Sequence, residues 1–463
     1  MFLETLKQIF DTFGAQIFVP FIIFIVALFL KVQVKKAFFA ALYAGIGLQG
    51  FTLLLNAFIP VIMPVVQQMV ESTGVKLPVF DIGWQATAVV AYSTEVGMIF
   101  LGLGILLQIV LFLARWTNIF QPGDLWNNYS YMVWGSMIYL ITDSMALAIG
   151  CMIVLNLYSL LFSEMIARRW STYFNYPNCT IVQLHHVGTV PFGIGMNWIL
   201  DKLGAGKINL SPSDLQKKLG FLGEPIALGL LLGLFLGIMG NLKELGTLAS
   251  WGEIATVGVA TAAVMAIFPK VSGIFAQAFL PLTEAAKKKG KQGSKSREWY
   301  LGVNDAAGYG EAATLISGIT LIPIMVLMAL ILPGNEVLPV VDLIALPFMV
   351  QGLVAIMNGN IFKVLVSGTI WFSLGLYLAT YTAPIFTQVA TEVGVSIPTG
   401  VLLITSFGIL TKPIAGLIFL AFLSQSWLLI GLVIAIYAVS YFLFKKKKEA
   451  FYSYMENMNS RAA

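Results

Sequence analysis

The sequence is poor in the side chains that carry metal, redox and covalent chemistry. It has two cysteines, Cys151 and Cys179, and two histidines, the neighbours His185 and His186, among 463 residues. Two cysteines this far apart form neither a disulfide framework nor the ligand spacing of a zinc site. The chain also lacks a phosphate-binding GxxxxGK[ST] loop. We therefore expect no bound metal, no cofactor and no phosphoryl chemistry by this chain alone.

Charged residues are also scarce. They make up 11% of the chain, whereas hydrophobic residues make up 58%, and the mean hydropathy is +0.87. A soluble domain of this composition would expose large apolar patches and aggregate. The apolar residues are grouped in long blocks, and backbone groups in hydrocarbon must hydrogen-bond to one another. Such blocks form spanning helices of roughly 20 residues, so the sequence predicts an all-α polytopic membrane protein.

We expect about eleven transmembrane helices plus re-entrant hairpins. The apolar segments that predict them are Ile17 to Leu30, Ala37 to Met69, Val96 to Ala114, Met132 to Ile166 (as one helix or two), Pro225 to Met239, Ile254 to Phe268, Ala312 to Leu332, Val340 to Met357, Phe362 to Ala379 and Trp427 to Phe444. The amphipathic segment Met1 to Asp11 precedes them, and no small-residue cleavage site follows the first block, so we expect the first helix to be retained.

Polar stretches interrupt the apolar pattern in four places. Trp84 to Glu95 is small and polar, which predicts a half-helix or broken backbone. Asn175 to Leu200 and Ile397 to Leu423 contain prolines, glycines and polar side chains, and we interpret both as hairpins that enter the membrane without crossing it. Thr117 to Tyr131 mixes aromatic and polar residues, which is typical of an interfacial helix.

Lysine and arginine are clustered between the apolar blocks. The clusters are Lys31 to Lys36, Arg168 with Arg169, Lys202 to Lys218, Lys287 to Arg297 and Lys445 to Lys448. Under the positive-inside rule these loops are cytoplasmic, which predicts an external N-terminus and a cytoplasmic C-terminus. We interpret the clusters as topology signals, and they do not indicate a nucleic-acid partner.

Four carboxylates fall in or beside apolar segments: Asp143, Glu224, Asp305 and Glu311. A carboxylate at mid-membrane costs about 2.5–3.5 kcal/mol on insertion scales, so such a residue usually has a function or a partner. Each of the four could instead cap a half-helix or pair with a lysine. For Glu224, which precedes Pro225, a place at a helix start is at least as well supported as a binding role.

Asp305 is the strongest candidate for a binding residue. It follows Asn304 and is flanked by glycines, which let a backbone approach a ligand closely. His185 and His186 lie in the first expected hairpin, and neutral imidazoles can donate to and accept from sugar hydroxyl groups. A histidine in a helix bundle also often serves only as a hydrogen bond between helices. Asn358 and Asn360 form a further polar break, with substrate contact as one of two interpretations.

A short internal similarity is also present. Leu77-Pro78-Val79-Phe80-Asp81-Ile82 resembles Leu338-Pro339-Val340-Val341-Asp342-Leu343. Transporters are often built from inverted repeats with the site between them. The expected topology places both copies outside, which does not fit an inverted pair, so we interpret the similarity as coincidence.

Several motifs, in order along the chain, resemble one known family. They are Val79-Phe80-Asp81-Ile82-Gly83-Trp84, Ser213-Asp214-Leu215-Gln216-Lys217-Lys218-Leu219-Gly220, Gly223-Glu224-Pro225, Gly302-Val303-Asn304-Asp305, Leu332-Pro333-Gly334-Asn335 and Val337-Leu338-Pro339. These resemble the galactitol-type IIC component of the bacterial phosphoenolpyruvate-dependent sugar phosphotransferase system, over nearly the whole chain. The Pro-His-Gly element of that family is matched only loosely, by Leu184-His185-His186-Val187-Gly188, which leaves open which histidine corresponds.

The resemblance implies a single integral membrane IIC domain over residues 1–463, with no IIA or IIB domain. It further implies a homodimer with interleaved scaffold and core subdomains, similar to the ascorbate-type IIC fold, that moves a sugar or polyol by an elevator mechanism. A separate cytoplasmic IIB subunit carrying phosphocysteine would phosphorylate the sugar. By this analogy one sugar site would gather polar residues from the breaks in the helices. The expected site residues are Thr94, Glu95, Asp143, His185, His186, Glu224, Asn304, Asp305, Asn358 and Asn360.

Two other functions remain open from the residues alone. The first is a secondary sugar transporter coupled to protons, with Asp143 or Asp305 carrying the charge. The second is a membrane-embedded hydrolase or transferase, for which the His185 and His186 neighbourhood provides the single candidate nucleophile-and-base environment. The residues do not distinguish galactitol from other small polyols or sugars.

Overall fold

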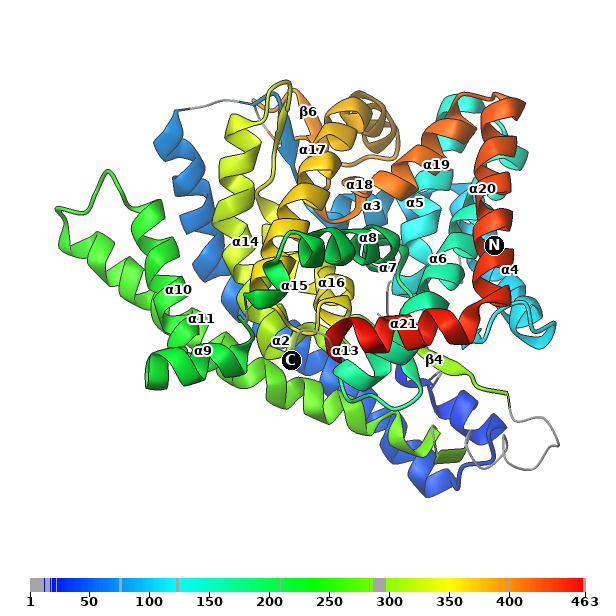
Figure 1. Cartoon of the computed structure of the whole chain (residues 1–463). Helices are drawn as coiled ribbons and strands as arrows, with labels where there is room; N and C mark the ends of the chain where they lie inside the picture. The colour runs from blue at the N-terminus through cyan, green and yellow to red at the C-terminus, as the bar shows by residue number, and fades with distance from the viewer. Residues whose placement is uncertain are drawn as a thin grey trace.

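The protein is built around long apolar helices (Figure 1). The computed structural model describes residues 12, 17, 19–21, 23–74, 77–121, 125–208, 210–282, 284–285, 297–398 and 400–460. Among these, seven helices are long and apolar enough to cross a membrane, or eight if one bent pair is a single span. The seven are α2 (Val34–Thr73), α4 (Glu95–Leu113), α6 (Met145–Tyr173), α11 (Leu248–Gln277), α14 (Ala312–Ile331), α17 (Ile361–Glu392) and α20 (Trp427–Lys446). A multi-pass membrane protein is therefore confirmed, whereas the expected count of eleven crossings is not.

Two expected segments lie outside the described residues. They are the amphipathic lead-in Met1 to Asp11 and all of the basic segment Lys287 to Arg297 except Arg297 itself.

Near the C-terminus, α21 (Lys448–Ser460) follows α20 and lies against α6. The Tyr452 hydroxyl donates to the Glu164 carbonyl oxygen at 2.6 Å, and Lys445 and Lys448 both pair with the buried Glu164 carboxylate.

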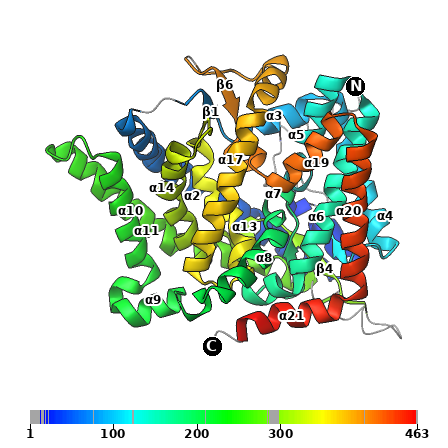
Figure 2. The ribbon, with the colours of Figure 1, turned by 45° about the horizontal axis from the view of Figure 1, so that its top comes forward.

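A layer of three helices, α2, α10 (Pro225–Gly240) and α11, forms one side of the molecule (Figures 1 and 2). α9 (Pro212–Leu219) precedes α10, and the two helical segments meet at an angle of 72°. Gly229, Gly233 and Gly237 recur every fourth residue on the side of α10 that faces α11. A β-carbon on Gly233 would lie 2.6 Å from the Val257 carbonyl oxygen. The small-residue stripe therefore brings two helix backbones together, as such stripes do in membranes.

We expect Gly233→Ala to lower the free energy of unfolding by about 1–3 kcal/mol, because the added methyl overpacks the contact between α10 and α11. Gly252→Ala is the matched control, because Gly252 lies on α11 with no atom within 4 Å of the added carbon. That change should be neutral or stabilising, since alanine is favoured over glycine in helices by about 1 kcal/mol. Thermal unfolding in detergent measures both variants. Equal melting temperatures would mean that the contact between the helices can widen without cost.

Two small parallel sheets modify the expectation of an all-α fold. The first has strand order β5 (Val337–Leu338), β1 (Val79–Asp81), β6 (Leu403–Thr405), and the second has order β2 (Ile119–Phe120), β4 (Tyr300–Val303), β3 (Cys179–Ile181). The strands have two to four residues, too few to produce a period of two in the sequence. Labelled strands of the two sheets lie at opposite ends of the molecule in Figures 1 and 2.

Two stretches of the chain have a similar order of strands and helices, and we call them the first and the second passage. The first runs from β1 to α8 and the second from β4 to α19. Between the layer helices, β1 leads into α3 (Trp84–Ser93) and α4, β2 into α5 (Leu125–Thr142) and α6, and β3 into α7 (Leu184–Val187) and α8 (Thr189–Lys202). The second passage places β4 before α13 (Ala306–Tyr309) and α14, β5 before η3 (Val341–Ala345), α15 (Leu346–Met349), α16 (Gln351–Ile356) and α17, and β6 before α18 (Phe407–Leu410) and α19 (Pro413–Leu423). Each sheet takes its central strand from one passage and both flanking strands from the other.

This exchange of strands joins the two passages into one body. The similar segments noted in the sequence take part in it as neighbours, because Val79 pairs with Val337 and Phe80 with Leu338 in parallel register. Short helices follow the strands, and those labelled α7, α13 and α18 lie in the middle of the molecule (Figure 1).

Three expectations about individual segments are corrected. Thr117 to Tyr131 is not an interfacial helix, because it contains β2 and the start of α5, and Asn128 to Ile138 of α5 are buried in the helix bundle. Val340 to Met357 is not a continuous span but a series of short helices, η3, α15 and α16. Met132 to Ile166 is not one helix, since Asp143 lies at an exposed turn between α5 and α6 with φ of 52°. The alternative of two helices within Met132 to Ile166 is thus confirmed.

Two buried carboxylates hold the ends of β1, β5 and β6 together. Asp81 is fully buried, and its Oδ1 accepts hydrogen bonds from the backbone N–H groups of Gly83 and Phe407. Its Oδ2 accepts from the backbone N–H groups of Val340 and Asp342. The Asp342 carboxylate in turn accepts from the backbone N–H groups of Trp84 and Gly408 and from the Ser406 hydroxyl, at 2.6–2.9 Å. The two side chains thus accept hydrogen bonds from backbone N–H groups that the short strands do not pair.

We expect Asp81→Asn to lower the free energy of unfolding by about 2 kcal/mol or more, because an amide group would face two backbone N–H donors that now have an acceptor. Asp143→Asn is the control. Asp143 is exposed and in the left-handed region, where asparagine is readily accepted. Chemical denaturation of the two purified variants provides the comparison. If Asp81→Asn were as stable as Asp143→Asn, the carboxylate would not be what holds the strand ends.

Candidate substrate site

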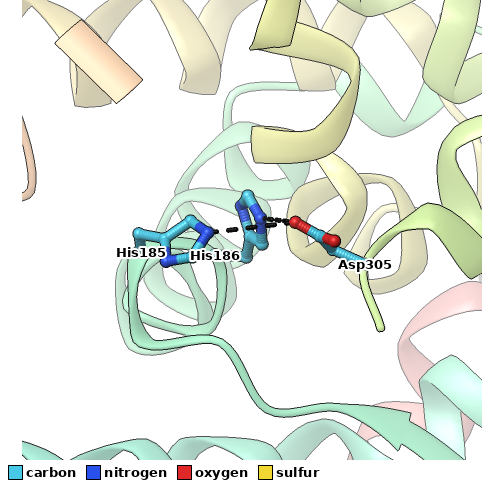
Figure 3. A group of neighbouring side chains, drawn as sticks. All are labelled: His185, His186 and Asp305. Carbon is cyan, nitrogen blue, oxygen red and sulfur yellow. Dashed lines mark hydrogen bonds and ion pairs between the residues drawn. The ribbon is translucent and has the colours of Figure 1, made fainter. Parts of the chain in front are cut away.

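His185, His186 and Asp305 converge where two of the strand-and-helix segments meet (Figure 3). The histidines lie on α7, directly after β3, and Asp305 lies between β4 and α13. Because β3 and β4 are parallel neighbours, the residues that follow them emerge at the same edge of the sheet. His186 Nε2 lies 2.5 Å from Asp305 Oδ2, and His185 Nε2 lies 3.9 Å from the same oxygen. The two imidazole ring centres are 4.0 Å apart.

The hydrogen bond to Asp305 determines what the histidines offer to a ligand. A carboxylate accepts, so His186 Nε2 carries the proton and Nδ1 keeps a free lone pair. His185 faces the same oxygen through Nε2, and we assign it the same tautomer. Both Nδ1 atoms are buried and have no hydrogen-bond partner in the described part of the chain. Buried polar atoms are normally paired, so the site offers two acceptors that a hydroxyl-bearing ligand could use.

Gln351 completes this side of the site and was not expected from the sequence. It begins α16, and its Nε2 donates to the Asp305 carbonyl oxygen at 2.6 Å. Its Oε1 is buried without a partner among the described residues, which adds a third open acceptor. Gly308 makes room for it, because a β-carbon there would lie 2.2 Å from Gln351 Oε1. The sequence signal that could have identified Gln351 is its position as a polar residue inside the largely apolar segment Val340 to Met357.

Tyr129 lies against the same cluster. It is buried on α5, and its ring centre is 5.7 Å from that of His185. Asp305, which follows β4 of the second sheet, and Asp342, which follows β5 of the first sheet, both lie close enough to interact electrostatically with it. Tyr129 is therefore near carboxylates from both sheets.

The other expected site residues lie in a variety of places. Asn304 is buried next to Asp305, and its Oδ1 accepts from the backbone N–H of Ala306. Thr94 caps α4 through the backbone N–H of Gly97 and bonds to Ser136 at 2.6 Å. The structure does not bring the remaining five into the cluster. Three are exposed: Glu95 in the first turn of α4, Asp143 at the turn before α6 and Glu224 at the start of α10. The other two have partners in the protein, because Asn358 is hydrogen-bonded to Arg169 and Asn360 caps α17 by accepting from the backbone N–H of Lys363.

Two histidines and a carboxylate are also a familiar set of metal ligands. Their ligand atoms all lie within 4.8 Å of one another. Ligand atoms around a tetrahedral zinc ion lie roughly 3–3.5 Å apart, because each bond is about 2.0–2.1 Å long. His186 Nε2 and Asp305 Oδ2 are closer than this, at 2.5 Å, and form a direct hydrogen bond. The arrangement fits a hydrogen-bonding site better than a metal site.

Comparison with known proteins identifies the family of this chain. The family model described as "PTS system sugar-specific permease component" matches residues 8–400. The chain belongs to this family. The permease is 28% identical over 395 residues to the galactitol-specific EIIC component of Escherichia coli strain K12, covering 85% of this chain and 86% of that protein. It is 30% identical over 384 residues to a protein of the same strain described as "Putative permease IIC component", covering 83% and 86% of the two chains.

Membership confirms the resemblance seen in the sequence. The permease is the sugar-transporting membrane component of a phosphotransferase system, and a transport subunit rather than an enzyme. Most of the candidate site falls inside the matched region, because His185, His186, Asp305 and Gln351 all precede residue 400.

The two histidines of the permease should differ in their effect on stability. We expect His186→Ala to lower the free energy of unfolding by about 1–3 kcal/mol, because it leaves the largely buried Asp305 carboxylate without its closest donor. His185→Ala should cost less, since His185 Nε2 is 3.9 Å from the same oxygen. Thermal unfolding of the unliganded protein measures this difference without reference to a substrate. A larger loss for His185→Ala would contradict the assignment of His186 as the principal partner.

Proposed function

We propose that the permease binds a small uncharged sugar or sugar alcohol at the His185, His186 and Asp305 cluster. The observation that carries this proposal is the set of buried, unpartnered acceptors at Nδ1 of both histidines and Oε1 of Gln351, which hydroxyl groups would satisfy. The relative that is galactitol-specific supports a polyol as the substrate class. Neutral polyols need several fixed hydrogen-bonding groups in a site protected from water.

We further propose that the substrate is passed inward by elevator-type alternating access. This movement requires one part of the protein to slide against another. The layer of α2, α10 and α11 is suited to act as the fixed scaffold, and the two interlocked sheets with their short helices as the moving core. In this arrangement the N-terminus is outside and the C-terminus is cytoplasmic. A second copy of the chain would pack against the scaffold, which carries an apolar groove of about 650 Å³ between α2 and the preceding helical segment.

In this proposal a separate IIB subunit phosphorylates the sugar at the cytoplasmic face. A substrate hydroxyl oxygen attacks the phosphorus of the IIB phosphocysteine, the sulfur–phosphorus bond breaks, and the leaving thiolate takes up the proton of the hydroxyl group. The permease contributes position, since His186 Nδ1 can accept a hydrogen bond from a hydroxyl group while Asp305 holds the imidazole. The charged phosphate ester then cannot return through a site built for a neutral molecule.

The main alternative is a secondary transporter coupled to protons. Asp143 and Asp305 were its two candidate carriers. Asp143 is exposed at a turn, and Asp305 is hydrogen-bonded to His186. Uptake into proteoliposomes separates the two functions: the proposed function requires the phosphorylated soluble partners for accumulation. Accumulation of unmodified sugar driven by a pH gradient alone would support the alternative instead.

Asp305→Asn tests the binding site directly. We expect this variant to lose sugar binding, because an amide cannot hold His186 Nε2–H as the carboxylate does, while the protein still inserts and dimerises. Asp214→Asn is the matched control, since Asp214 caps the exposed helix α9. Isothermal titration with a panel of polyols, together with size-exclusion chromatography, provides both readouts. An Asp305→Asn variant that binds with wild-type affinity would remove Asp305 from the site.

A further inference from the structure

Lys412 is a buried lysine that has no oxygen partner among the residues that the structure describes. It lies between α18 and α19, and 2% of its surface is exposed. Its ammonium group contacts the Met349 sulfur at 3.2 Å and the ring of Phe372, whose centre is 5.2 Å away. No hydrogen bond from it to an oxygen occurs in the described part of the chain. An ammonium group has three N–H donors, and a thioether is a weak acceptor, so most of its hydrogen-bonding capacity is unused.

The carboxylate of Asp342 does not satisfy these donors. Asp342 is close enough to Lys412 for their charges to interact, but the two do not form an ion pair. Both Asp342 oxygens already accept hydrogen bonds, one from Trp84 and the other from Ser406 and Gly408. Burying an ammonium group without hydrogen bonds is costly. Lys412 therefore combines deep burial with unused hydrogen-bond donors, as expected of a residue that binds a ligand.

Lys412 also lies near the candidate substrate site. Its sulfur contact, Met349, belongs to α15, and α15 packs against both α7 and α13, the helices next to the two histidines and Asp305. The charge on Lys412 acts on both histidines. Lys412 comes from the segment after β6, whereas the histidines come from the segment after β3, so the two groups approach from different sheets. It lies beyond residue 400, where the match to the family model ends.

The open groups on the two sides are complementary. The ammonium group of Lys412 offers donors. His185 Nδ1, His186 Nδ1 and Gln351 Oε1 offer acceptors. A hydroxyl group can donate and accept at once, so a chain of hydroxyl groups satisfies both sides, whereas a carboxylate can satisfy only the donor side.

We propose that Lys412 is a second anchor for the substrate, donating hydrogen bonds to hydroxyl oxygens of a neutral polyol whose other hydroxyl groups donate to His185, His186 and Gln351. This inference rests on the proposed function and adds a specificity to it. The site takes an uncharged polyhydroxy compound. It disfavours the corresponding aldonic acid, whose carboxylate would be repelled by Asp342 if it bound Lys412, and the corresponding amino-polyol, which Lys412 repels.

The test compares Lys412→Met with Lys363→Met in the full-length protein. Lys363 is a matched control, because it is also buried, at 4% exposure, but it is paired with Asp201 and with Asn197 at 3.0 Å. The probe is the tightest binder in a panel of galactitol, sorbitol, arabitol and ribitol. We expect Lys412→Met to weaken its binding by about tenfold or more, the usual effect of losing hydrogen bonds to a charged group. Lys363→Met should bind within about twofold of wild type, by the same scale.

Two results would overturn the inference. The first is wild-type affinity in a folded Lys412→Met protein, which would make Lys412 only a counter-charge for Asp342. The second is tighter binding of the aldonic acid than of the polyol by the wild-type protein, which would make the substrate an anion. This second measurement needs no variant, so it decides the question even if Lys412→Met fails to fold. If Asp305→Asn loses binding while Lys412→Met retains it, the proposed function stands and the inference about Lys412 fails.

Discussion

The structure depends on satisfying backbone amides where a strand ends inside an apolar bundle. The residues that follow strands of two or three residues have backbone N–H groups beyond the reach of the ladder, and in a membrane protein water is not available to pair with them. Asp81 meets this constraint by accepting four backbone hydrogen bonds, and Asp342 accepts two more together with one from a serine hydroxyl. These seven donors come from three segments far apart in the chain. The first sheet is therefore held by side-chain acceptors as much as by its own ladder.

The second sheet meets the same constraint differently, and this difference creates the site. Asn304 accepts a hydrogen bond from the backbone N–H of Ala306, and the side-chain amides of Gln183 and Gln351 donate to the carbonyl oxygens of Val303 and Asp305. Because side-chain amides pair with the backbone near the second sheet, the Asp305 carboxylate is left to hydrogen-bond to His186. In the first half the carboxylates are saturated by the protein, whereas in the second half imidazole and amide acceptors remain open. A repeated architecture can thus be structural at one end and, in the proposed function, bind the substrate at the other.

The sequence predicted the long helices and the breaks between them, but not what fills the breaks. The polar stretch Trp84 to Glu95 correctly indicated a half-helix before α4, and the two expected hairpins correspond to strands with short helices after them. The strands were missed because two to four residues carry no periodic signal. Gln351 was missed because it lies in a segment whose hydropathy resembles a span. Hydropathy reports average polarity over many residues, and a binding site needs one polar atom in the right place.

The same limit explains why Asp305 could be singled out while its neighbours could not. Asp305 has a local signal, because glycines and Asn304 surround it in the sequence. Its partners come from α7, more than a hundred residues earlier, and the pairing of β3 with β4 brings them together. Asn358 had an equally polar local context, but its side chain is bonded to Arg169, and Asn360 caps a helix. Local composition identifies a break in a helix, whereas strand register decides which breaks meet.

The contact between the α2, α10 and α11 layer and the rest of the protein bears on the proposed movement. Phe51 of α2 and Phe268 of α11 pack on Tyr309 of α13, with ring centres 6.4 and 4.5 Å away, and Tyr309 packs on Phe348 at 4.1 Å. Aromatic contacts of this kind are weakly directional compared with the hydrogen bonds around Asp81. A sliding step would exchange one set of ring contacts for another and break the hydrogen bond from the Tyr176 hydroxyl to the Ser272 carbonyl oxygen of α11. One that separated the ends of β1, β5 and β6 would break seven hydrogen bonds to buried carboxylates, so any movement should carry the first sheet as a unit.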